Sequence, residues 1–87
     1  MATSPMIVEL ETEIADLERQ SRTLEEYINT HKKALEEGTT LIGAEVTEGL
    51  IKDARVSKVL VDANKSIKTQ ELEMVRLLAP LGVVFAR

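Results

Sequence analysis

His31 is the one histidine of this 87-residue sequence and the side chain best suited to acid–base or metal chemistry near neutral pH. It follows Tyr27 by one helical turn and precedes Lys32 and Lys33. No cysteine occurs, and no serine or second histidine stands at a spacing that would complete a nucleophilic set. The pattern predicts a polar residue at the edge of a helix seam. The alternative is a pH-sensitive residue within a packed interface.

Three acidic residues, Glu9, Glu13 and Asp16, fall on one face of a helix and resemble a divalent-metal site or an acid–base pair. Charges beside a coiled-coil seam are more commonly solvated flanks. The turn at 39–43 lacks the lysine and the spacing of a phosphate-binding loop. Without cysteine, a disulfide framework and thiolate-rich zinc sites are excluded. The sequence therefore predicts no enzyme, catalytic residue, metal, cofactor or small-molecule substrate.

Charge and hydropathy restrict the class of partner. The formal net charge is −4, whereas nucleic acids and anionic membranes attract cationic surfaces. Asp53 and Asp62 interrupt the basic residues of the second half, and aromatic residues are not interleaved with them: Lys52, Arg55, Lys58, Lys65 and Lys68. We expect no nucleic-acid partner. No run of about 18–20 apolar residues suggests a membrane span, and residues 1–5 lack a secretory signal, so we expect a soluble, intracellular, cytoplasmic protein.

The first half predicts one long helix over 5–37, with residues 1–4 as its N-terminal cap. Ser4 can accept hydrogen bonds from the first turn, and Pro5 suits the first helical position. Gly38 is suited to end the helix and begin a turn at 38–43. Seam positions recur at alternating steps of three and four residues, as in a coiled coil: Ile7, Leu10, Ile14, Leu17, Ser21, Leu24, Ile28, His31 and Leu35.

The second half predicts a helix over 44–79 that Pro80 ends, followed by an apolar tail at 80–87. Its seam is expected along a second alternating series: Leu60, Ala63, Ile67, Gln70, Met74 and Leu77. Gly49 and several β-branched residues lower the helix propensity of 46–61. A β-hairpin with strands near 56–62 and 66–68 is the alternative there.

Together these elements predict an all-α fold, an antiparallel two-helix coiled-coil hairpin that is part of an intermolecular helical bundle. Residues whose numbers sum to about 81 should face each other. Ile14 would then meet Ile67, and Glu13 and Asp16 would approach Lys65 and Lys68. Such exposed ion pairs contribute about 0–1 kcal/mol each, so they set orientation more than stability.

The second helix carries more apolar residues than one narrow partner helix can cover. Uncovered apolar area of this kind marks an interaction surface. We expect the interface to comprise Leu50, Ile51, Val61, Leu72, Val75, Leu78, Leu81, Val84 and Phe85. The tail either folds back over the open end of the hairpin near Ile7 and Val8, or inserts into a neighbouring chain.

Apolar residues that the two helices cannot cover by themselves predict a structural, assembly or adaptor subunit that joins other chains through coiled-coil contacts. Its partners would be further copies of itself, other helical subunits, or both. The alternative is a small regulatory or co-chaperone-like module that captures an amphipathic helix of a client protein.

Overall fold

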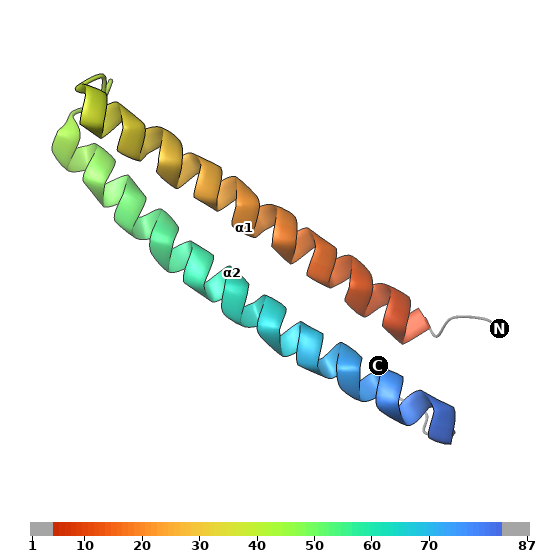
Figure 1. The fold of residues 1–87 in the computed structure, drawn as a ribbon. Coiled ribbons are helices and arrows are strands. Elements are labelled where there is room, and N and C mark those ends of the chain that lie inside the picture. The colour runs from red at the N-terminus through yellow and green to blue at the C-terminus, as the bar shows by residue number, and fades with distance from the viewer. Residues whose placement is uncertain (1–4, 83–87) are drawn as a thin grey trace.

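The chain folds as two long helices joined by a short turn. A computed structural model describes residues 5–82, in the order α1 (Pro5–Glu37), α2 (Ala44–Leu78) and the short 3₁₀ helix η1 (Ala79–Leu81). α1 and α2 run antiparallel, with the turn at one end and both helix ends at the other (Figure 1). The predicted helical hairpin is confirmed. The strand alternative for 56–68 is wrong, because α2 is continuous through this segment.

α1 ends where the glycine predicts. Gly38 adopts a left-handed φ of 68°. Its N–H donates to the carbonyl of Leu35 at 3.3 Å, and the N–H of Thr39 donates to that of Ala34 at 2.9 Å. These two bonds form a Schellman cap, which satisfies carbonyls that the end of the helix leaves without partners. The N-cap predicted at Ser4 lies outside the described residues.

α2 begins after Gly43, whose φ of 93° turns the chain into the helix. The backbone N–H of Thr47 donates to the Gly43 carbonyl at 3.1 Å, and the Thr47 hydroxyl donates to the same oxygen at 2.8 Å. At the other end, Pro80 lies within η1 and the α-helix stops at Leu78, one residue before the predicted end. Proline offers no N–H for the helical ladder, which explains the change to a 3₁₀ turn.

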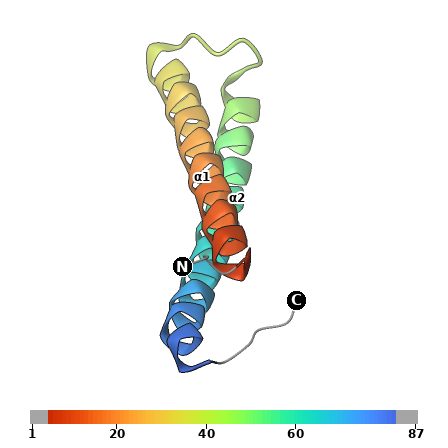
Figure 2. The same ribbon diagram turned by 90° about the vertical axis from the view of Figure 1, so that its right-hand side faces the viewer.

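The hairpin is a rod of 59 × 19 × 17 Å. It is a single layer of two helices that cross at a shallow angle (Figure 2). The predicted register near a sum of 81 is confirmed by the pair Glu13 and Lys68, whose charged atoms lie 3.1 Å apart. A rod only two helices wide leaves every helix with one side uncovered, so the seam must supply the whole core.

The core lies in two separate clusters along the seam. Near the open end, Leu10, Leu72 and Val75 pack together and are nearly fully buried. Near the turn, a second cluster joins α1 and α2 and consists of Ile28, Ile51 and Ala54. Leu24 and Leu35 pack against the second cluster. Between the clusters the seam contains the buried Leu17 and is otherwise largely polar, with Ser21 facing Asp62.

Candidate protein-protein interface

Three predicted interface residues belong to the hairpin's own seam. Ile51, Leu72 and Val75 are buried against α1, so the prediction that a second chain covers them is corrected. Leu50, Val61 and Leu78 are half-buried, and Leu81 is exposed. Val84 and Phe85 lie outside the described residues.

The residues predicted to form the seam of α2 instead point away from α1. Leu60 is 66% exposed, Ile67 62% and Met74 58%. The expected contact of Ile14 with Ile67 is therefore wrong, and Ile14 packs against the cluster of Leu10, Leu72 and Val75. The register along the rod is as predicted, but α2 is rotated so that its most apolar face is outside.

The exposed face forms one continuous heptad series that extends from the turn to η1. We call it the outer stripe. All its members are exposed, and they alternate steps of four and three residues: Ile42, Val46, Gly49, Asp53, Val56, Leu60, Ala63, Ile67, Gln70, Met74, Leu77 and Leu81. From Val46 to Leu77 these members lie on α2, where such spacing is typical of a helix that packs along a second helix; Ile42 lies in the turn and Leu81 in η1. Sequence reasoning found the segment from Leu60 to Leu77 but assigned it to the seam with α1, where the structure does not place it.

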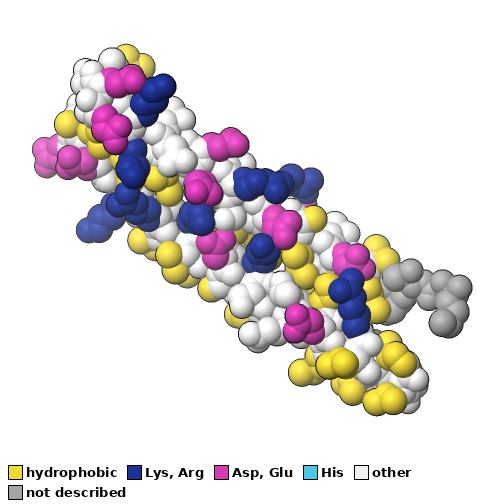
Figure 3. Space-filling model, viewed as in Figure 1, with side chains coloured by type: hydrophobic (Ala, Val, Ile, Leu, Met, Phe, Trp, Pro, Cys, Tyr) yellow, Lys and Arg dark blue, Asp and Glu magenta, His cyan; other side chains and the backbone are white. Residues whose placement is uncertain are grey.

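α2 carries a second heptad series that faces α1. It consists of Thr47, Ile51, Ala54, Lys58, Val61, Lys65, Lys68, Leu72 and Val75, all buried or half-buried. With 3.6 residues per turn, the two series lie roughly 150° apart around the helix. Figure 3 shows hydrophobic side chains along the edge of α2 that faces away from α1. α2 therefore carries apolar residues on two nearly opposite sides, and α1 covers one of them.

The seam of α2 is least apolar where the outer stripe is most apolar. Between 58 and 68 the seam contributes three lysines and Val61, whereas the outer stripe contributes Leu60, Ala63 and Ile67. The lysine stems can lie along the seam while their ammonium groups reach its edges. Lys65 pairs with Glu18 at 3.3 Å, and Lys68 pairs with Glu13 at 3.1 Å.

A hydrogen-bonded group bridges the helices in the middle of the seam. The Ser21 hydroxyl donates to Asp62 at 2.7 Å, and the Lys58 ammonium donates to the other Asp62 oxygen at 2.9 Å. The bond from Ser21, followed by that from Lys58, lowers the pKa of Asp62 below its usual value. The bond to Asp62 in turn raises the pKa of Lys58. These shifts favour the charged forms in the folded hairpin.

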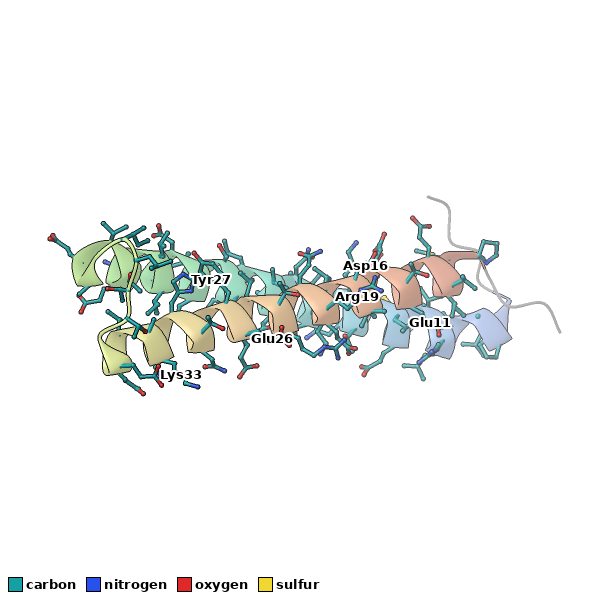
Figure 4. All side chains as sticks on the ribbon, turned by 90° about the horizontal axis from the view of Figure 1, so that it is seen from above. Glu11, Asp16, Arg19, Glu26, Tyr27 and Lys33 are labelled. Carbon is teal, nitrogen blue, oxygen red and sulfur yellow. The ribbon has the colours of Figure 1, made fainter. Side chains whose placement is uncertain are left out.

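Outside the seam, the charges of α1 form a solvated flank. Asp16 and Arg19 pair with each other on α1 (Figure 4), and Lys33 approaches Glu37. Among residues 5–82, no group of three or more His, Cys, Asp or Glu side chains is placed to hold a metal ion. This part of the chain therefore offers side chains for ion pairing and none arranged for metal chemistry.

His31 lies at the turn end of the rod and is half-buried. Its Nδ1 is 2.9 Å from the carbonyl oxygen of Tyr27, which accepts a hydrogen bond from Nδ1 in the tautomer that carries the proton there. The centroids of the Tyr27 and His31 rings lie 4.2 Å apart. An open hollow of about 300 Å³ lies beside His31, between Ala34 and Ile42, and threonines contribute much of its lining. No Asp, Glu, Lys or Arg lines this hollow, so the position of His31 fits a seam-edge residue.

Neither α1 nor α2 is long and apolar enough to cross a membrane, as judged over residues 5–82.

The chain shows no significant match to any protein-family model, curated protein or solved structure.

Proposed function

We propose that this chain is a structural subunit that assembles with other helical chains through the outer stripe of α2. The observation that carries the proposal is an exposed heptad series on the side of α2 turned away from α1, whose members other than Gly49, Asp53 and Gln70 are apolar. Leu77 and Leu81 at its end are each 74% exposed. Extended apolar stripes of this kind cost free energy in water and mark sites of association.

The division of polarity on α2 supports the same role. A helix that served only its own hairpin would place its most apolar face in the seam. α2 instead places Lys58, Lys65 and Lys68 there and exposes Leu60 and Ile67. This distribution is expected of a helix that occupies an inner position in a larger assembly.

Capture of a client helix would use the same surface. Modules of that kind usually lay the client in a groove between their own elements. From Val46 to Leu77 the outer stripe lies on one helix and forms its outward side (Figure 3). A single helical ridge suits side-by-side packing with another helix, which favours permanent assembly over reversible capture.

The proposal is tested by the native mass of the full chain in extracts of the cells that make it. We expect a mass above that of the 9.7 kDa chain, and a shift toward that value in the variant Leu60→Glu with Ile67→Glu. The matched control is Val8→Glu with Leu41→Glu, which adds the same charges at exposed apolar positions outside the stripe. The proposal is wrong if the unaltered chain migrates as a monomer, or if both variants keep the higher mass.

A further inference from the structure

The outer stripe has a two-fold pattern that identifies its occupant. We propose that a second copy of this chain covers it, with the two α2 helices packed antiparallel about an axis that passes between Val61 and Asp62. This inference rests on the proposed function and names the partner. In this arrangement, stripe residues whose numbers sum to 123 lie opposite each other.

Along the whole stripe this register matches residues of like polarity. Leu60 faces Ala63 of the second copy, and Val56 faces Ile67. Farther out on α2, the opposed pairs are Met74 with Gly49 and Leu77 with Val46; Ile42 and Leu81, just beyond the two helix ends, are apolar as well. Each of these pairs repeats on the other side of the axis, as a two-fold interface requires.

The two polar residues of the stripe also face each other. Asp53 lies opposite Gln70 of the second copy, where the amide can donate to the carboxylate. A shift by one heptad would place each of them against an apolar residue. Polar residues within a coiled-coil seam set its register and its oligomeric state in this way. The pair therefore favours this register over its neighbours.

Size and charge agree with the same register. A Cβ added at Gly49 would meet nothing within 4 Å inside the hairpin, so open space remains opposite the long Met74 side chain. Beside the stripe, Lys52 and Glu73 of the second copy occupy the same flanking heptad position; their numbers sum to 125, which places them about 3 Å apart along the rod. Neither takes part in an ion pair within the segment 5–82, so both are available for contact across the axis.

The fold leaves room for this partner. α1 lies on the opposite side of α2, so it does not obstruct the stripe (Figure 1). The 35-residue α2 is about 52 Å long, and a contact strip about 10 Å wide gives roughly 1,000 Å² of buried surface for the pair of chains. That area is near the lower limit of about 1,000 Å² for a specific interface.

The first test is the mass of the purified full chain by sedimentation equilibrium over a concentration series. We expect twice the 9.7 kDa of one chain at micromolar concentration, and a monomer of unchanged helicity for Leu60→Glu with Ile67→Glu. The control Val8→Glu with Leu41→Glu should remain a dimer. A purified chain that stays monomeric at several hundred micromolar, or forms a trimer, overturns the inference.

Spin labels distinguish antiparallel from parallel packing. The sequence has no cysteine, so Arg55→Cys and Glu48→Cys each introduce one labelling site away from the stripe. In the proposed register, residue 55 lies opposite 68 and residue 48 opposite 75. The label-to-label separations along the rod are then about 20 Å and about 40 Å. Equal short distances at both sites would indicate a parallel dimer, which overturns this inference while the proposed function stands.

Charge reversal tests the register itself. Lys52→Glu and Glu73→Lys should each weaken dimerisation by about three- to tenfold, because each places like charges opposite each other twice in the dimer. The double variant should restore the affinity. The control Glu48→Lys, outside the interface, should have little effect. If the double variant dimerises as weakly as either single variant, the pairing of Lys52 with Glu73 is contradicted.

Discussion

At the scale of single residues, Asp62 is a charged group that connects the two helices. It accepts hydrogen bonds from Ser21 on α1 and from Lys58 one turn away on α2. The group lies between the two apolar clusters, where a slip of one helix turn would separate Ser21 from Asp62. We infer that this contact fixes the register of the hairpin, as isolated polar contacts do in coiled coils.

The lowered pKa of Asp62 predicts a dependence of stability on pH. A carboxyl group with a lowered folded-state pKa stabilises the fold above its unfolded value of about 3.9, and this contribution is lost as the pH falls through the folded-state pKa. The raised pKa of Lys58 acts in the opposite sense, and its contribution is lost only as the solution becomes more alkaline than the pKa of that ammonium group. Both contributions are therefore present at neutral pH.

We expect Asp62→Asn to be less stable than the unaltered chain at pH 7, and the difference to close as the pH falls from about 5 to about 2. Thermal unfolding followed by circular dichroism across this range measures it. Ser21→Ala, which removes one donor to Asp62, should show the same trend with a smaller amplitude. A stability difference that does not change with pH would show that the Asp62 charge is not the cause.

Two glycines of the hairpin differ in whether their backbone conformation requires glycine. Gly49 lies inside α2 with no atom within 4 Å of an added Cβ, so Gly49→Ala should stabilise the hairpin by about 1 kcal/mol through helix propensity. Gly38 has a φ of 68°, and Gly38→Ala should destabilise it by about 1 kcal/mol or more. Urea unfolding of a chain held monomeric by Leu60→Glu and Ile67→Glu measures both. Equal effects of the same sign would contradict this assignment.

At the scale of elements, α1 was predictable and the orientation of α2 was not. The seam positions of α1 are all buried or half-buried, and Gly38 ends the helix as predicted. α2 has two heptad series, and both satisfy the three-four spacing. The series with Leu60, Ile67 and Met74 is the more apolar, so pattern alone assigns it to the seam.

The true seam of α2 is difficult to recognise from sequence because lysines occupy part of it. Lys68 reaches Glu13 on α1, as the register predicted, whereas Lys65 reaches Glu18 and not Asp16, which pairs with Arg19. The same observation limits prediction of the interface. A surplus of apolar residues on α2 was visible in the sequence, but the sequence pattern alone could not show which of them α1 covers.

Packing within the seam predicts unequal costs for two leucines. Leu10 is 0% exposed and packs with Leu72 and Val75, so Leu10→Ala should reduce the free energy of unfolding by about 2–4 kcal/mol. Leu41 in the turn is 101% exposed, and Leu41→Ala should change it by less than about 0.5 kcal/mol. Denaturant unfolding compares them. Similar losses in both variants would contradict the assigned burial.

At the scale of the whole molecule, stability should be coupled to association. A partner that binds only the folded hairpin raises its apparent stability, and the effect grows with concentration. We expect the melting temperature of the unaltered chain to rise over a hundredfold increase in protein concentration. For Leu60→Glu with Ile67→Glu it should stay constant. Scanning calorimetry makes the comparison, and a constant melting temperature in both chains would argue against coupling.

The segmented seam has a mechanical consequence. Because Pro5 and Leu78 lie at the same end of the rod (Figure 1), tension applied between these residues would peel the helices apart from that end toward the turn. The cluster around Leu10 would open first. The ion pairs that Lys68 and Lys65 form with α1 would separate next, and the cluster around Ile28 would open last. The hairpin would thus yield in two force steps, and tension applied along the rod instead would load both clusters at once.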